Sequence, residues 1–164
     1  MPYSQFTLSK VKKDFALTTV EGVRFLPDVS PIAPSDTLRN FLVESLPLAV
    51  TGSEKARSEL IISPVLVEVR RILERKISVF SGEDFTVDES LGLNGVCDFL
   101  ISRSPELLAI EAPAVVIVEA KKADLTLGIG QCIAEMVAAA RESLTRGRSR
   151  RRREVLCRAA VLLT

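Results

Sequence analysis

The chain has 164 residues, of which 47% are hydrophobic and 26% are charged, and its formal net charge is +1. These values predict one soluble globular domain. The sequence contains no histidine, which excludes Ser-His-Asp and Cys-His hydrolases and enzymes whose zinc is held by histidine. No apolar stretch is long enough to cross a bilayer, and the first residues lack the apolar core of a signal peptide. A cytoplasmic location without a membrane partner is therefore expected.

The first fifty residues (1–50) are predicted to form an extension, a hairpin followed by a helix, that packs on the core. Two β-rich runs over residues 15–25 flank a Gly-containing pair, which favours a hairpin. A loop with three prolines follows. Ser35 or Asp36 is then expected to cap a short helix that runs to residue 46 and is ended by Pro47.

A long helix is predicted next, because Thr51 and Glu54 have the spacing of a capping box. It should continue to about Arg75, with a kink at Pro64. Its buried stripe consists of apolar residues at helical spacing: Ile62, Leu66, Val69 and Leu73. Glu59 lies three residues before the first of these and seven before the second, so it is expected to point toward the core. A carboxylate in that direction requires a compensating partner.

The second half of the chain is predicted to contain most of the strands. They are expected over residues 76–80, 85–87, 96–102 and 114–121, and the apolar run over residues 155–163 is a candidate for the last strand. An amphipathic helix should begin at Gly128. This order predicts an α/β (α+β) fold, with a central mixed sheet flanked by helices.

Charge is distributed unevenly, because six arginines lie between Arg146 and Arg153. Without them, 16 basic residues remain against 21 acidic ones, so the body of the protein is acidic. An arginine tract can neutralise nucleic-acid phosphates. This tract lacks interleaved aromatic residues for stacking on bases, and we favour the simpler interpretation of a solvated loop.

Two carboxylates and one amine are expected to converge where two neighbouring strands end. Side chains alternate along a strand, so Glu119 and Lys121 share a face. Asp98 lies on the preceding strand, and antiparallel pairing would bring it close to Glu119. Mg²⁺ prefers oxygen ligands of this kind. The set therefore suits a site in which Mg²⁺ (or Mn²⁺) polarises a phosphate, while the lysine orients or deprotonates water or stabilises negative charge.

Asp98 followed by Glu119-Ala120-Lys121 resembles the D…(D/E)xK signature of the PD-(D/E)xK nuclease superfamily, which has the restriction-endonuclease-like fold. The resemblance covers roughly residues 51–143 and extends to the run GLNGVCDFLI…PAVVIVEAKK…LGIGQCIAEMVAA, which is similar to a family of small, mainly bacterial proteins of this superfamily. Members commonly carry an acidic residue on the helix before the sheet, which Glu59 matches. Many carry a glutamine on the helix after the motif, which Gln131 matches. Where the signature has proline before the first acid, this chain has Cys97.

The resemblance implies a nuclease-like core over residues 51–164 and assigns a role to each matching residue. Asp98 and Glu119 would ligate the metal, with the backbone carbonyl of Ala120 as a further ligand. Lys121 would position or deprotonate the attacking water. Glu59 would orient a water or assist the metal, and Gln131 would support the site or contact the scissile phosphate. The expected activity is metal-dependent hydrolysis of phosphodiester bonds, with DNA, or else RNA, as the substrate.

The sequence is compatible with other functions and residue roles. The same fold can be an inactive or partner-dependent nucleic-acid-binding or structural module, which the acidic body and few aromatic residues favour, or a different metal-dependent phosphohydrolase. Glu59 can be a helix carboxylate paired to Lys or Arg, Gln131 can satisfy backbone donors, and Asp98 can lie in a turn. A homo-oligomer is compatible with the sequence, although nothing in it shows one. After the Gln131 helix the family leads us to expect a further strand and helix, and the shorter segment found here fits a truncated or divergent end of the core.

Overall fold

The computed structural model describes residues 2–20, 22, 28–111, 114–121, 125–146 and 158–163. Helices and strands are mixed in it, so the predicted α+β class is confirmed. The helical elements are η1 (Tyr3–Gln5), α1 (Leu8–Asp14), α2 (Asp36–Thr51), α3 (Glu54–Arg57), η2 (Ser58–Ile62), α4 (Ser63–Ile72), η3 (Glu89–Leu91) and α5 (Leu125–Arg146). The strands are β1 (Ser78–Asp84), β2 (Val96–Ser102), β3 (Ala114–Lys121) and β4 (Arg158–Leu163). No helix in these ranges is both long and apolar enough to span a membrane.

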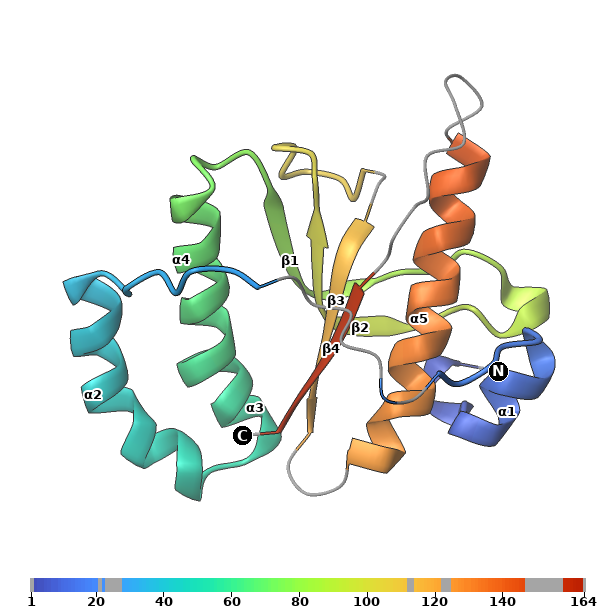
Figure 1. The fold of residues 1–164 in the computed structure, drawn as a ribbon, viewed down its shortest axis with the longest axis horizontal. Coiled ribbons are helices and arrows are strands. Elements are labelled where there is room, and N and C mark those ends of the chain that lie inside the picture. Colours follow the sequence, from blue (N-terminus) through green and yellow to red (C-terminus); the bar gives the residue numbers. More distant parts are fainter. Residues whose placement is uncertain are drawn as a thin grey trace.

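The four strands form one sheet in the order β1-β2-β3-β4 (Figure 1). The first three pair antiparallel, and β4 pairs parallel to β3 after the chain has returned through α5. The predicted bounds of β2 and β3 are confirmed, and β1 extends four residues beyond its predicted end at residue 80. The predicted strand over residues 85–87 is wrong, because only an isolated bridge between Asp88 and Leu93 follows β1.

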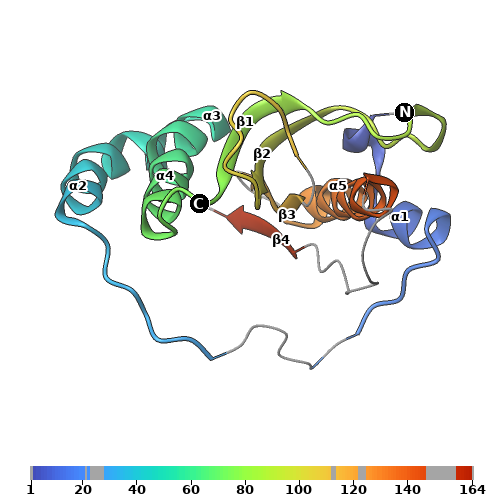
Figure 2. The same ribbon diagram turned by 90° about the horizontal axis from the view of Figure 1, so that it is seen from above.

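Helices cover both faces of the sheet, with α4 on one side and α5 on the other (Figure 2). Residues of β2 alternate between two apolar clusters, as expected for a strand with both faces buried. Leu100 belongs to the cluster under α5, whereas Phe99 and Ile101 belong to the cluster under α4. Helix α2 packs against α3, η2 and α4 and lies outside α4, on the side away from the sheet.

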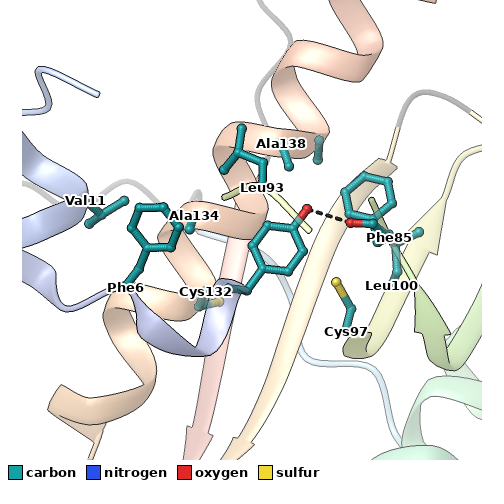
Figure 3. Close-up of a cluster of buried hydrophobic side chains, with 11 residues drawn as sticks. Phe6, Val11, Phe85, Leu93, Cys97, Leu100, Cys132, Ala134 and Ala138 are labelled. Atoms are coloured by element: carbon teal, nitrogen blue, oxygen red, sulfur yellow. Dashed lines mark hydrogen bonds between the residues drawn. The ribbon is translucent and has the colours of Figure 1, made fainter. Parts of the chain in front are cut away.

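The N-terminal segment packs against α5 and closes one core cluster (Figure 3). The buried Tyr3 hydroxyl donates a hydrogen bond to the Phe85 carbonyl oxygen (2.6 Å), shown by the dashed line in Figure 3. Gly130 lets the two backbones approach closely, because a Cβ there would lie 2.2 Å from the Phe6 carbonyl oxygen. Only glycine fits that contact without displacing the N-terminal backbone.

The predicted N-terminal hairpin is wrong in its first strand. Helix α1, which the sequence reasoning missed, occupies residues 8–14, and the Thr7 hydroxyl caps it by accepting from the Lys10 amide (3.2 Å). Ala16 is left-handed (φ 52°) and Leu17 N–H donates to the Lys12 carbonyl (2.9 Å). This arrangement is a standard helix C-terminus and turns the chain away from a strand conformation. The second predicted strand of the hairpin, over residues 23–25, lies outside the described residues.

Pro47 does not end α2, which continues to Thr51. A proline inside a helix removes one backbone hydrogen bond and strains the preceding turn. The last turn of α2, beyond Pro47, is nevertheless stabilised, because the buried Arg57 guanidinium donates hydrogen bonds to the carbonyl oxygens of Ala49 (3.4 Å) and Val50 (3.1 Å). Ser35 is confirmed as the N-cap, since its hydroxyl accepts from the Leu38 amide (3.2 Å).

The predicted long helix begins later than expected and is not uniform. Its N-cap is Ser53 rather than Thr51, so the capping-box prediction is wrong. The π-helical turn η2 separates α3 from α4 directly before Pro64, where the kink was predicted. Proline cannot donate to the carbonyl of residue 60. The Ser45 hydroxyl of α2 donates to that Leu60 carbonyl instead (2.9 Å), which ties α2 to the irregular turn.

Candidate functional site

Strands β2 and β3, which carry the two predicted acidic positions, are neighbours in the sheet. Phe99 pairs with Val118 and Leu100 with Ile117 in an antiparallel ladder. These pairs end at Phe99 and Val118, and the same register continued by one position would set the backbone of Asp98 opposite that of Glu119. Opposing residues of an antiparallel pair have Cβ atoms about 4.5–5.5 Å apart. The antiparallel pairing on which the predicted site depended is therefore present.

Asp98 lies where the regular pleat of β2 is interrupted. Cys97 packs in the cluster under α5, whereas Phe99 packs in the cluster under α4. Residues two apart in a regular strand share a face, so the alternation changes between these two residues. The register places Gly82 of β1 opposite Asp98, and Gly82 has a left-handed φ of +68°. This local distortion explains why a half-buried acid can occur in the middle of an otherwise apolar strand.

Asp98 and Glu59 line one open pocket of about 400 Å³ between the helical layer and the sheet. We call it the acidic pocket. Its lining contains three carboxylates, one amine and three hydroxyls, and consists of Glu54, Lys55, Ser58, Glu59, Ser63, Ser81, Gly82, Asp98 and Phe99. Helix α3 also contacts β3. The excess of carboxylates creates a negative potential that attracts a cation.

The expected inward direction of Glu59 is wrong, because its side chain is 59% exposed. Glu59 lies within η2, and a π turn takes in one more residue than an α turn. The extra residue rotates Glu59 away from the face that Ile62 and Leu66 bury. Glu59 instead forms an ion pair with Lys55 one turn earlier (2.8 Å). The hydrogen bond and the charge of Glu59 raise the pKa of the Lys55 ammonium above its ordinary value.

Glu119, Ala120 and Lys121 occupy the last three positions of β3. Their backbone pairs in parallel with residues 161–163 of β4, and the structure describes only the backbone at these three positions. Their predicted roles as metal ligands and as the catalytic lysine thus stay predictions. Glu119 directly follows Val118, the partner of Phe99, and this place at the end of β3 is what the hypothesis requires.

Gln131 does not line the acidic pocket. It lies on α5, where its side-chain amide donates to Glu135 one turn later (3.0 Å). Glu135 is completely buried. This hydrogen bond fixes the orientation of the Gln131 amide. The predicted role of Gln131 at the site stays a prediction.

Lys55, Ser58, Ser63 and Ser81 also line the acidic pocket, and the sequence reasoning did not select them. Lys55 could have been found, because it precedes Glu59 by four residues on a predicted helix, the spacing of a helical ion pair. The serines carry no comparable signal, because only the π turn and the bend at Gly82 bring them to the pocket.

The lining of the acidic pocket matches the donor chemistry of a hard divalent cation. Carboxylate and hydroxyl oxygens are the ligands that Mg²⁺ and Mn²⁺ take, and neither histidine nor cysteine is among the residues that line the pocket. Within the described side chains, no group of three or more His, Cys, Asp or Glu is placed to hold a metal ion. The Glu119 side chain is not among them, so the predicted Asp98–Glu119 pair is not covered by that result.

Comparisons of the chain with protein-family models, curated proteins and solved structures found no match.

Proposed function

We propose that the chain is a metal-dependent phosphodiesterase of the PD-(D/E)xK type that hydrolyses nucleic acid, DNA in the first place. The observation that carries the proposal is the antiparallel β2–β3 pairing, which ends at Phe99–Val118 and which, continued by one position, would set Asp98 opposite Glu119. Two carboxylates that lie opposite each other on neighbouring strands repel each other unless a cation lies between them. A divalent metal held by both is the simplest compensation.

The arrangement of elements supports a restriction-endonuclease-like core. A helical segment before the sheet contributes Glu59 to the pocket that Asp98 lines. The strand that carries the Glu119-Ala120-Lys121 motif is followed by α5, on which Gln131 lies, and then by the parallel strand β4. These are the relative positions that the resemblance implies for the acidic helix residue, the motif and the glutamine.

The proposed chemistry divides between the ion and the residues of this chain. A bound Mg²⁺ or Mn²⁺ would polarise the scissile phosphate and lower the pKa of a water molecule. Asp98 and Glu119 would hold the ion, with the Ala120 carbonyl as a further ligand. Lys121 would take up or orient the proton of the attacking water and stabilise the charge that develops on the phosphate. Glu59 would orient a water once it is released from Lys55.

Cleavage of labelled DNA and RNA oligonucleotides with Mg²⁺ or Mn²⁺ tests the proposal. Asp98→Asn, Glu119→Gln and Lys121→Met should each lower the rate by about 100-fold or more. Matched controls lie on or just before β1, outside the pocket: Asp84→Asn, Glu83→Gln and Lys76→Met, all at exposed positions. These controls should retain the wild-type rate. Equal rates in the site variants and their controls would refute the proposal.

A second candidate is a binding module without catalysis on the same fold. The Lys55–Glu59 ion pair favours it, because in this structure Glu59 is engaged by a cation of the chain itself. This alternative predicts that the wild-type chain retards oligonucleotides in a gel without cutting them in either metal. It also predicts that Asp98→Asn leaves the binding constant unchanged, whereas the enzyme proposal predicts metal-dependent cleavage.

A further inference from the structure

The acidic pocket is lined by two sets of polar groups with opposite preferences. Its three carboxylates attract a cation. The second set can donate hydrogen bonds to an anion and consists of one ammonium and three hydroxyls, those of Lys55, Ser58, Ser63 and Ser81. A phosphodiester cleaved at a metal ion needs both, because its oxygens contact the metal and hydrogen-bond donors together. The proposed function uses the carboxylates and Lys121 but none of the second set.

The ammonium of the second set is engaged by a carboxylate of the first. Lys55 Nζ lies 2.8 Å from Glu59 Oε1. The two residues are four apart, so the pair forms within the helical segment of α3 and η2. While it persists, Glu59 is neutralised by the chain itself, and the ammonium is occupied when a phosphate approaches. The pair therefore withholds one group from each set.

The Lys55–Glu59 pair can be exchanged easily. Its side chains are 81% and 59% exposed, and water and salt screen ion pairs of this kind. Lysine also carries its charge on a flexible four-carbon stem, so the ammonium can move while its backbone stays in α3. A divalent cation has twice the charge of the ammonium and is attracted by every carboxylate of the pocket, so it competes with Lys55 for Glu59.

Metal binding also changes the charge that a substrate meets. Three carboxylates and one ammonium give the lining a formal charge of −2. A phosphate that approaches this lining is repelled. With a divalent cation bound the lining is neutral, and an ammonium released from Glu59 can pair with the phosphate. The charges thus favour an order in which the metal binds before the nucleic acid.

We propose that Lys55 is a phosphate-binding residue that Glu59 masks until a divalent cation takes over the Glu59 carboxylate. Metal and nucleic acid then bind cooperatively. The inference rests on the proposed function for the metal and the substrate class, and adds a role for Lys55 and an order of binding. By linkage, the metal strengthens nucleic-acid binding by the same factor by which nucleic acid strengthens metal binding.

A second ion pair provides an internal comparison. Lys76 and Glu74 also form an exposed pair, with both side chains 74% exposed, and neither residue lines the acidic pocket. Substitutions in this pair change the charge of the protein surface in the same way as those in the Lys55–Glu59 pair. Effects that appear only for Lys55 and Glu59 therefore report on the pocket and not on net charge.

Fluorescence anisotropy of a labelled DNA oligonucleotide tests the coupling, with either a chelator or saturating Ca²⁺, which takes oxygen ligands as Mg²⁺ does. A gel checks that the oligonucleotide stays intact. Ca²⁺ should strengthen wild-type binding by about tenfold or more, and Lys55→Met should reduce this gain to about threefold or less. Lys55→Arg, which keeps the charge, and the control Lys76→Met should keep the wild-type gain. A wild type without a gain, or Lys55→Met with the full gain, would overturn the proposal.

The masking by Glu59 is tested in the chelator alone. Glu59→Gln should release Lys55 and strengthen oligonucleotide binding by about threefold to tenfold, whereas Glu74→Gln should change it by less than about twofold. Adding Lys55→Met to Glu59→Gln should abolish the increase, because the released ammonium is then absent. Equal increases in Glu59→Gln and Glu74→Gln would show an effect of net charge only and contradict the masking.

Cleavage assays separate this inference from the proposed function. If the wild type cuts nucleic acid and Lys55→Met keeps the full Ca²⁺ gain, the role of Lys55 is refuted and the nuclease proposal stands. If the gain depends on Lys55 in a chain that cuts neither DNA nor RNA, the nuclease proposal is refuted and the coupling of metal to nucleic acid stands.

Discussion

The two sides of the sheet are packed in different ways. On the α5 side, small residues of the helix allow the N-terminal segment to approach closely: Cys132, Ala134, Ala138 and Ala139 are all almost fully buried. On the α4 side the helices are irregular, α2 is covered on one face only, and the acidic pocket opens toward the sheet. The comparison indicates that the α5 side supplies most of the stability, whereas the α4 side presents the surfaces on which binding and catalysis can occur.

Gly130→Ala is expected to have the largest effect on the free energy of unfolding, and it tests the packing on the α5 side. Alanine favours a helix over glycine by about 1 kcal/mol, so an uncrowded position would gain stability. At Gly130 the added Cβ would meet backbone atoms of Phe6 and Thr7 at 2.2 and 2.5 Å. Overpacking of this kind costs about 1–3 kcal/mol or more, and chemical denaturation should show a net loss. A stabilised variant would show that the N-terminal segment does not pack on α5 as described.

Tyr3→Phe should cause the next largest loss of stability. It removes the hydrogen bond to the Phe85 carbonyl and leaves that acceptor buried, at a cost of about 1–2 kcal/mol. Burial also raises the pKa of the Tyr3 phenol above its usual range, and the nearby Cys97 and Glu135 add to the shift. The neutral phenol is the favoured form, so its contribution is complete below pH ~10 and is lost as pH rises further.

Tyr3 is the only tyrosine of the chain, so an absorbance titration reads this phenol alone. Its ionisation should coincide with alkaline unfolding measured by circular dichroism. Ordinary titration near pH ~10 in a chain that stays folded would contradict the burial of Tyr3.

Glu68 provides the corresponding test on the α4 side. It accepts two hydrogen bonds from Arg71 (2.7 and 2.8 Å) and one from the Ser35 amide (2.9 Å). These bonds, those from Arg71 foremost, lower the pKa of Glu68 from 4.5 to about 2. Because the folded pKa is lowered, its stabilising contribution is present above pH 4.5 and is lost as pH falls toward 2.

The pH dependence of unfolding between these values should therefore be shallower in Glu68→Gln than in the wild type. Glu74→Gln, at an exposed carboxylate paired with Lys76, is the matched control and should keep the wild-type slope. Identical slopes in the wild type and Glu68→Gln would show that Glu68 does not tie α4 to the start of α2.

The smallest effect on stability is expected from Lys55→Met, because its ion pair with Glu59 is exposed. The same change should strengthen Mn²⁺ binding by about threefold to tenfold, since it removes a positive charge beside the acidic pocket. Lys76→Met breaks a similar surface pair with Glu74, away from the pocket, and should leave Mn²⁺ binding unchanged. If both variants bind Mn²⁺ as the wild type does, Lys55 does not influence the site.

Strands β2 and β3 could be predicted from the sequence because they are nearly continuous apolar runs with clear ends. The helical layer could not, because its irregularities depend on tertiary contacts. Arg57 stabilises the end of α2 beyond Pro47, and Ser45 satisfies the carbonyl that Pro64 leaves open. The π turn that moves Glu59 into solvent has no signal in the spacing of apolar residues. For the same reason, the antiparallel pairing of β2 with β3 could be predicted, whereas the direction of Glu59 could not.

The central claim is that Asp98 and Glu119 share one metal ion, and a Mn²⁺ titration followed by electron paramagnetic resonance tests it most directly. The wild type should bind the ion, and Asp98→Asn and Glu119→Gln should each weaken binding by about 100-fold. The double variant should be little worse than either single one, because residues that act on one ion are not additive. Wild-type affinity in Asp98→Asn, or strictly additive losses in the double variant, would contradict a shared ion.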